Sequence, residues 1–159
     1  VVDNDLVTQT RDRFDLSKTI SEIVDHYVDI NEYPDVTINS DIQKNVVLLG
    51  LSERIGQVVV NLLDNAVSFS RPKGSINVQL LKKWRRKPLL VVEDSGPGVS
   101  EAGAERIFDR FYTSRSGHAE VENSSGLGLF ICRQIIEAHG GTIEVGKSAL
   151  GGARFEVNF

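Results

Sequence analysis

The sequence predicts an α/β domain in which helices and short strands alternate along the chain. Two observations support this fold class. Residues 53–70 carry apolar side chains at three- and four-residue spacing, which is typical of a helix with one apolar face. Several shorter segments alternate or run apolar between turn residues, as strands do. With 159 residues, the chain is long enough to bury the core of one domain.

The expected elements follow from the same patterns in chain order. The first expected helix begins near Asp15, with Asp15 or Ser17 as its N-cap, and ends before Tyr33. The second covers 53–70, and the third runs from Gly126 to about His139. The expected strands cover 36–39, 45–49, 75–82, 89–93, 142–145 and 153–159. Residues 1–14 are polar and mixed, and we expect a connector there.

The segments between these elements have their own signals. Residues 84–88 form a basic hairpin tip, which we expect to be a solvated loop, with partner binding as the alternative. Residues 113–125 have almost no apolar content, which is typical of a mobile surface loop. Gly140 and Gly141 end the preceding helix, as expected of a left-handed C-cap.

The composition excludes several classes of protein. The chain is 40% hydrophobic and 25% charged, and no apolar run reaches the ~18 residues that cross a bilayer. The net charge of −4 argues against nucleic acid as the main partner. No signal peptide opens the chain, and the absence of any Met predicts a fragment of a longer protein. Cys132 has no partner for a disulfide, so we expect a buried thiol in a reducing compartment.

Two asparagines are unusual on the 53–70 helix. Asn61 and Asn65 fall on one line at the border of the apolar face, whereas Asp64 points to the opposite, solvent side. Asn is a poor helix-interior residue because its side chain competes for backbone hydrogen bonds. Either both amides bond to neighbouring backbone, or they line a polar site in which an amide oxygen ligates a hard cation such as Mg²⁺.

A second motif follows the strand at 89–93. Asp94 at the strand end could accept a hydrogen bond from an exocyclic amine, and Gly96 and Gly98 permit positive φ and a close approach of a ligand to the backbone. An Asx-turn explains the same residues equally well.

A third motif, Gly126-Leu127-Gly128-Leu129, opens the last helix. Backbone N–H groups at a helix N-terminus favour anions such as phosphates. The motif is not a P-loop, because no Gly-Lys-Ser/Thr follows, and it is not a dinucleotide fingerprint, because no strand directly precedes it.

The order of the motifs is more specific than any one of them. Four segments follow one another: 61–66, 94–98, 108–112 (Phe-Asp-Arg-Phe-Tyr) and 126–129. In this order the chain resembles the catalytic, ATP-binding domain of bacterial two-component sensor histidine kinases, of the GHKL superfamily. The resemblance implies a two-layer α/β sandwich, the Bergerat ATP-binding fold, over residues 15–159. Its mixed, mostly antiparallel five-stranded sheet would carry three main helices on one face and a mobile ATP lid.

The resemblance also implies roles for the residues of the first two motifs. Asn65 would ligate a Mg²⁺ that bridges the ATP phosphates, and Asn61 would support this cluster. Asp94 would accept a hydrogen bond from the adenine amino group. Gly96 and Gly98 would let the base approach the chain.

Further roles follow from the remaining motifs. Phe69 and Val99 would pack on the adenine, and Tyr112 would pack at the base of a lid formed by 113–125. Arg110 would face the γ-phosphate, with an ion pair to Asp109 or Glu105 as the alternative. The hinge and phosphate-binding floor would be formed by Gly126, Leu127, Gly128 and Leu129.

Two positions depart from the family pattern. Ser68 stands where the family often has a Lys that reaches phosphate, and Ala153 stands where Thr is common. The candidates to replace the missing cation are Arg71, Lys73, Arg115 and His118.

Asn61 is informative about the reaction. In ATP-hydrolysing relatives this position holds a Glu that activates water, and an amide cannot act as a general base. The resemblance therefore favours phosphoryl transfer to a protein over hydrolysis. A rival interpretation is a regulatory ATP-binding module or pseudokinase, which Ser68 alone favours, and a second rival is an anti-sigma-type serine kinase.

The sequence contexts of His26, His118 and His139 do not match the phosphoacceptor site of the family. We expect His26 on a helix surface and His139 at a helix C-terminus, where a cation suits the helix dipole. The acceptor histidine would then lie on a dimerisation domain that precedes Val1 in the parent, so the fragment would bind ATP without phosphorylating itself. We further expect a monomeric fragment without nucleic-acid or membrane contact. Its dimeric parent would be an inner-membrane sensor with this domain in the cytoplasm, serving a response regulator.

Overall fold

The computed structural model describes residues 4–30, 32–112 and 126–159. Five strands form the central sheet, in the spatial order β2-β4-β5-β7-β6. Their bounds are β2 Val36–Ile42, β4 Gly74–Leu81, β5 Leu89–Asp94, β6 Thr142–Lys147 and β7 Ala153–Asn158. The β2–β4 pair is parallel and the other pairs are antiparallel.

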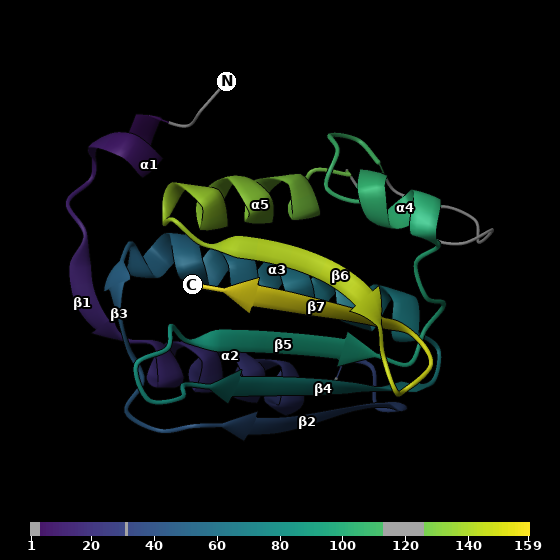
Figure 1. The fold of residues 1–159 in the computed structure, drawn as a ribbon. Helices are drawn as coiled ribbons and strands as arrows, with labels where there is room; N and C mark the ends of the chain where they lie inside the picture. The colour runs from purple at the N-terminus through teal and green to yellow at the C-terminus, as the bar shows by residue number, and fades with distance from the viewer. Residues whose placement is uncertain (1–3, 31, 113–125) are drawn as a thin grey trace.

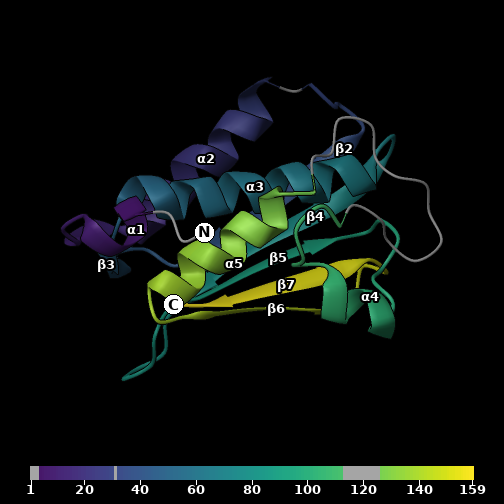
Figure 2. The same ribbon diagram turned by 90° about the horizontal axis from the view of Figure 1, so that it is seen from above.

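Three long helices cover one face of this sheet (Figures 1 and 2). They are α2 Leu16–Ile30, α3 Ser52–Ser70 and α5 Gly128–Ala138. The arrangement confirms the two-layer α/β sandwich with a mixed five-stranded sheet.

The strands bury alternate side chains against these helices, because successive residues of a strand point to opposite faces. On β4 the buried residues are Ile76, Val78 and Leu80, each at most 1% exposed. Helix α3 lies at the centre of the layer, between α2 and α5 (Figure 2). Its buried residues repeat at helical spacing: Ile55, Val58, Val59, Leu62, Leu63, Ala66, Val67 and Ser70. Each large apolar side chain buried in this way contributes about 1.5–3 kcal/mol to folding.

A second, two-stranded sheet was not expected. It pairs β1 Asp12–Asp15 with β3 Val47–Gly50, so the strand expected at 45–49 lies outside the main sheet. The first of these strands falls at the end of the segment expected to be a connector, where a short helix, α1 Asn4–Thr8, also forms. Leu6 is 2% exposed, and Arg11 Nη2 donates to the carbonyl oxygens of Leu6 and Ala138, both at 2.9 Å. This segment therefore packs on the domain, and the domain boundary itself stays a prediction.

The helix ends are set by specific caps. The short helix α4, Glu101–Arg106, begins at Ser100, whose Oγ accepts from the Gly103 amide at 2.9 Å. At the end of α5, Gly140 has a φ of 77°, and the Gly141 amide donates to the Ile136 carbonyl at 2.9 Å. These features form a Schellman cap and confirm the expected left-handed glycine stop.

The loop between β4 and β5 projects from the body of the domain (Figure 2). Every residue from 82 to 87 is exposed, and Trp84 is 85% exposed, as expected of a solvated loop. Across the described ranges, every helix is too short or too polar to cross a bilayer.

Candidate nucleotide site

Three of the predicted site residues, Asn61, Asn65 and Phe69, lie between the middle and the end of α3. Asn61 and Asn65 are both half-buried, at the border of its apolar face, as predicted. The Asn61 Nδ2 atom donates to the carbonyl oxygen of Gly128 at 3.2 Å. This hydrogen bond joins the Asn helix to the start of α5, although the two residues are 67 positions apart. The neighbouring Asp64 is exposed, and it accepts a hydrogen bond from Tyr27 Oη of α2.

Asp94 is the buried carboxylate of the site, with 1% exposure at the end of β5. Its Oδ1 atom accepts from the Gly96 amide at 3.1 Å and from the Ala153 amide at 3.2 Å. The first contact is an Asx-turn, which confirms the alternative explanation of this motif. The second contact comes from β7 and holds the carboxylate from the other side. Two backbone donors on one oxygen fix the orientation of the group.

The two glycines of this loop differ in how closely they are packed. Neither Gly96 nor Gly98 has a positive φ, so neither uses the backbone freedom that glycine permits. A β-carbon on Gly96 would overlap the carbonyl oxygen of Phe69, at the end of α3. On Gly98 it would lie 3.6 Å from the Gly152 carbonyl oxygen, an ordinary contact. The missing side chain of Gly96 therefore lets α3 and the Asp94 loop touch.

The two residues expected to pack on the base both lie next to the Asp94 loop. Phe69 is half-buried in the last turn of α3, and Val99 is half-buried beyond the Asp94 loop, where it packs against the core. Tyr112 is also half-buried, and the Arg106 guanidinium lies 5.2 Å from its ring centroid. A β-carbon on Gly103 would lie 3.5 Å from the Tyr112 hydroxyl oxygen. Tyr112 thus packs on α4, and its place at the base of a lid stays a prediction.

The start of α5 differs slightly from expectation. The helix begins at Gly128 rather than Gly126, with Leu127 as its N-cap residue and Leu129 buried in the core. Gly126 has a φ of 69°, and its carbonyl accepts from the Phe111 amide at 2.8 Å. The turn before α5 is therefore tied to the end of the Phe-Asp-Arg-Phe-Tyr segment. Residues 113–125, the expected lid, lie outside the described residues.

The exposed Arg110 lies between two aromatic rings. Its guanidinium carbon is 5.3 Å from the Phe111 ring centroid and 5.4 Å from that of Phe130. Of the two acids considered as alternatives, Asp109 is paired with Arg106 at 3.7 Å. Contact with aromatic faces holds a guanidinium in place while its charge stays available.

The cation missing at Ser68 has no established replacement. Arg71 stacks on Tyr33, with 4.7 Å between its guanidinium carbon and the ring centroid, and Lys73 is exposed. The other two candidates, Arg115 and His118, lie outside the described ranges.

His139 lies at the C-terminus of α5, as expected, but as a neutral ring rather than as the cation that suits the helix dipole. Its Nε2 atom accepts from the Leu51 amide at 3.0 Å, and Nδ1 lies 2.7 Å from the Ile135 carbonyl oxygen, to which it donates. Both contacts require a neutral ring, and burial lowers the pKa of His139, with the nearby positive Arg11 also lowering it. The histidine therefore links the end of α5 to the start of α3. Local sequence gave no signal for this contact, because the partners are 88 residues apart.

The other groups agree with expectation. Cys132 is buried, and its burial raises the pKa of the thiol to about 12. His26 is exposed on α2. Within the described ranges, no group of three or more His, Cys, Asp or Glu side chains is arranged to hold a metal ion.

Comparison with known families decides the identity of this arrangement. Residues 50–159 match the family of histidine kinase-, DNA gyrase B- and HSP90-like ATPases. The chain belongs to this family. The matched range contains α3, the Asp94 loop and the start of α5, which are the three parts joined by the contacts above.

Relatives within this ATPase family narrow the assignment. The chain is 42% identical to the sensor protein ChvG of Rhizobium meliloti (strain 1021), over 70% of the chain and 20% of ChvG. It is 41% identical to the sensor protein KdpD of Clostridium acetobutylicum, over 76% of the chain and 13% of KdpD. The chain thus spans a fifth or less of these two proteins.

Solved structures give the same assignment. The mycobacterial sensor histidine kinase MprB matches with a TM-score of 0.78 and 26% identity, over 93% of this chain and 95% of that one. The catalytic domain of the histidine kinase ThkA matches with a TM-score of 0.78 and 27% identity, over 94% and 96%. This member of the ATPase family is therefore an ATP-binding catalytic domain of the sensor histidine kinase type.

Proposed function

We propose that this domain binds Mg-ATP and transfers the γ-phosphoryl group to a histidine on a dimerisation domain of its parent protein. A response regulator would then take the phosphoryl group from that histidine. The observation that carries the proposal is the position of α3, which contacts the Asp94 loop through Phe69 and the start of α5 through Asn61. One helix thus holds a base-binding loop and a phosphate-binding turn in register.

Asp94 would select the base. A buried carboxylate held by two backbone amides is a fixed acceptor, and the exocyclic amino group of adenine is a matching donor. Phe69 and Val99 would supply the apolar surface on which the ring packs. Gly96 and Gly98 carry no side chain between the loop and the base.

Asn65 would hold the metal. Mg²⁺ is bound in many nucleotide sites by one or two protein oxygens together with substrate phosphates and water. An amide oxygen on α3, in a site without a cluster of acidic ligands among the described residues, fits this pattern. The ion would neutralise the charge that moves with the phosphoryl group.

The phosphates would lie at the N-terminus of α5. This helix has 11 residues, and its first backbone N–H groups have no partner within the helix. The segment from Gly126 to Leu129 would present these groups to the phosphate oxygens. Arg110, held between the rings of Phe111 and Phe130, would face the γ-phosphate.

Transfer to a protein is favoured over hydrolysis. The Asn61 amide donates to the Gly128 carbonyl and cannot take a proton from water. His139 is an unsuitable acceptor, because both ring nitrogens are engaged with backbone groups. Because the sequence contexts of all three histidines differ from the phosphoacceptor site of the family, the acceptor would come from another domain of the parent. A dimeric, membrane-anchored parent with this domain in the cytoplasm is part of the same proposal.

The proposal is tested by adding the domain and Mg-ATP to a dimerisation domain made separately from the same parent. We expect acid-labile phosphate on that domain and none on the catalytic domain alone. A matched reaction with Asp94→Asn should be strongly reduced. If ATP binds and the dimerisation domain gains no phosphate, the domain is a regulatory ATP-binding module instead.

A further inference from the structure

The turn between β6 and β7 lies directly against the carboxylate of Asp94. The Gly152 amide donates to the Asp94 carbonyl at 3.1 Å, and the next amide, of Ala153, donates to Asp94 Oδ1 at 3.2 Å. A β-carbon on Gly152 would overlap both of these Asp94 oxygens. Where this turn sits therefore determines where the carboxylate sits.

Ser148 organises the turn from inside. Its amide donates to the Gly152 carbonyl at 2.9 Å, and its carbonyl accepts from the Gly151 amide at 3.0 Å. Its Oγ atom accepts from the Leu150 amide at 3.0 Å, and the side chain is nearly buried. One serine thus makes three hydrogen bonds within a five-residue turn, from 148 to 152.

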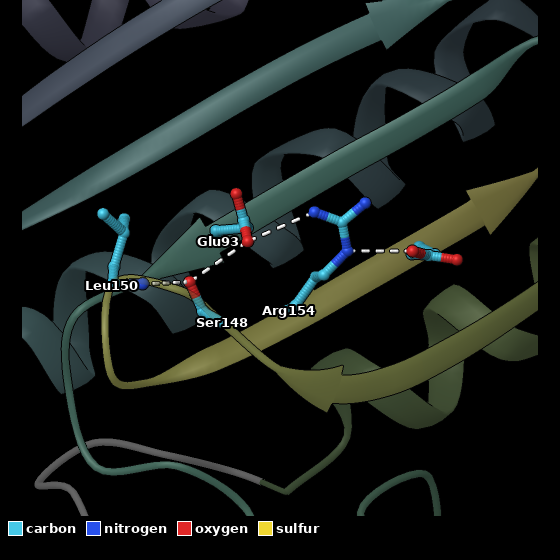
Figure 3. A network of polar contacts seen from close by, with 5 residues as sticks. Glu93, Ser148, Leu150 and Arg154 are labelled. Atoms are coloured by element: carbon cyan, nitrogen blue, oxygen red, sulfur yellow. Dashed lines mark hydrogen bonds and ion pairs between the residues drawn. The ribbon is translucent and has the colours of Figure 1, made fainter.

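Glu93 attaches this turn to β5 on the face of the sheet opposite to the one that Asp94 faces (Figure 3). Its Oε1 atom accepts from Ser148 Oγ at 3.1 Å and pairs with Arg154 Nη1 at 3.2 Å. The Glu93 side chain is 16% exposed, so water competes less for these contacts than at a surface ion pair. Arg154 also pairs with Glu156 through Nε at 2.8 Å.

We propose that Glu93 and Ser148 are positioning residues that hold the 148–152 turn against Asp94 and thereby set the preference for a purine with an amino group at C6. This inference rests on the proposed function, because it deepens the role given to Asp94. Glu93 precedes Asp94 on the same strand and points to the other face. Glu93 therefore holds the turn through Ser148, while the Asp94 side chain contacts the Ala153 amide on the core side.

The expected consequence is specific to the base. Without the Glu93–Ser148 bond, the turn moves and the Ala153 amide no longer holds Asp94 Oδ1. The carboxylate then loses its fixed alignment with the amino group of the base. Contacts to the phosphates come from α3 and the start of α5, so they should be retained.

The test compares Glu93→Ala and Ser148→Ala with the control Glu156→Ala. The control removes a carboxylate that also pairs with Arg154 but lies outside the contact with Ser148. Affinities for Mg-ATP and Mg-ITP are measured by calorimetry, since ITP carries a carbonyl in place of the C6 amino group. Glu93→Ala and Ser148→Ala should each reduce the ATP-to-ITP preference by about threefold or more, the scale of one weakened hydrogen bond to a charged group. Glu156→Ala should leave the preference unchanged.

A second measurement separates this inference from the proposed function. Amide hydrogen exchange of Gly152 and Ala153 in the nucleotide-free domain should be faster in Glu93→Ala than in the wild type or Glu156→Ala. Should Glu93→Ala fold poorly, Ser148→Ala replaces it in the same exchange measurement, because this variant removes the donor of the same hydrogen bond. An unchanged ATP-to-ITP preference, or exchange equal to that of Glu156→Ala, overturns the inference. A wild-type domain that binds no ATP overturns the proposed function, while the exchange result still decides whether Glu93 holds the turn.

Discussion

The paired strands β4 and β5 have a buried, closely packed end at Asp94 and an exposed end at the connection between them. At the end of β5, Asp94 is 1% exposed and is enclosed by the Gly96 loop and the 148–152 turn. At the other end, the connection to β4 runs through six consecutive exposed residues, 82–87, including Trp84 at 85% exposure. Five of the chain's 18 lysines and arginines lie in these six residues. The same two strands therefore carry one fixed carboxylate and one solvated group of cations.

The comparison of the two ends shows that a side chain is fixed in position only where backbone groups pack closely around it. Around Asp94, the lack of a side chain on Gly96 and Gly152 allows neighbouring backbone to pack closely, and this packing fixes the position of the carboxylate. In the hairpin, Arg85 has a φ of 59° and stacks loosely on Trp84, with 5.9 Å between its guanidinium carbon and the ring centroid. Exposed charges of this kind contribute little to stability. Substitutions at the two ends should therefore have effects of different size.

The largest expected effect is that of Gly96→Ala. The new methyl group overlaps the Phe69 carbonyl, so α3 and the Asp94 loop must separate, which should cost about 2–3 kcal/mol of unfolding free energy. Urea unfolding measures this loss. Gly98→Ala is the matched control, since its β-carbon makes only an ordinary contact. Equal destabilisation by both substitutions would show that the tight contact at Gly96 is unimportant.

Asp94→Asn should come next and should act on binding rather than on folding. An amide oxygen can still accept from Gly96 and Ala153, so the unfolding free energy should change little. ATP affinity should fall by about 1–3 kcal/mol, because the charged acceptor for the base amine is lost. Calorimetry with Mg-ATP measures the change, and an unchanged affinity would contradict the assignment of Asp94.

His139 provides a smaller, pH-dependent effect far from Asp94 in the sequence. Its pKa is lowered in the folded domain, so the unfolded chain binds more protons as the pH falls through the ordinary histidine value of about 6.5. The stability from the neutral ring is present above that value and is lost as the pH falls toward the folded pKa. Thermal unfolding is measured from about pH 7.5 to about pH 5.5, a range on both sides of that value. The stability of the wild type should fall more steeply with pH over this range than that of His139→Gln. Parallel pH profiles would mean that the Leu51 contact does not depend on ring charge.

Trp84→Ala should have the smallest effect. The side chain is 85% exposed, so the unfolding free energy should change by no more than about 0.5 kcal/mol. ATP affinity should stay the same, because the hairpin and Asp94 lie at opposite ends of β5. Urea unfolding and calorimetry on this variant set the baseline for the other three. A loss of binding would mean that the two ends of the sheet are coupled.

Much of this arrangement was predictable from local sequence. The spacing of Ile55, Leu62 and Ala66 predicted α3 to within one residue of its start, because helical burial repeats every 3.6 residues. The order of the four motifs predicted the family, and Asp94 and Asn61 were predicted as site residues. The roles of the site residues toward ATP and Mg²⁺ stay predictions.

Other features had no local signal. Strand β1 has four residues with no apolar alternation, so only its pairing with β3 defines it. The sequence showed that Gly96 permits positive φ or a close approach to the backbone, and only the structure shows that the contact with the Phe69 backbone requires glycine there. The sequence placed His139 at a helix C-terminus, but its role as an acceptor depends on the Leu51 amide at the start of another helix.

The sequence by itself determined the helices, most strands, the family and the residue types of the site, since each depends on neighbours within a few positions or on the order of short motifs. Only the tertiary structure decided which atoms outside its own loop hold Asp94 in place. Glu93 and Ser148 are 55 residues apart, and Asp94 and Ala153 are 59 apart. Such contacts form because β5 and β7 become neighbours when the core is buried, and no local pattern encodes that distance.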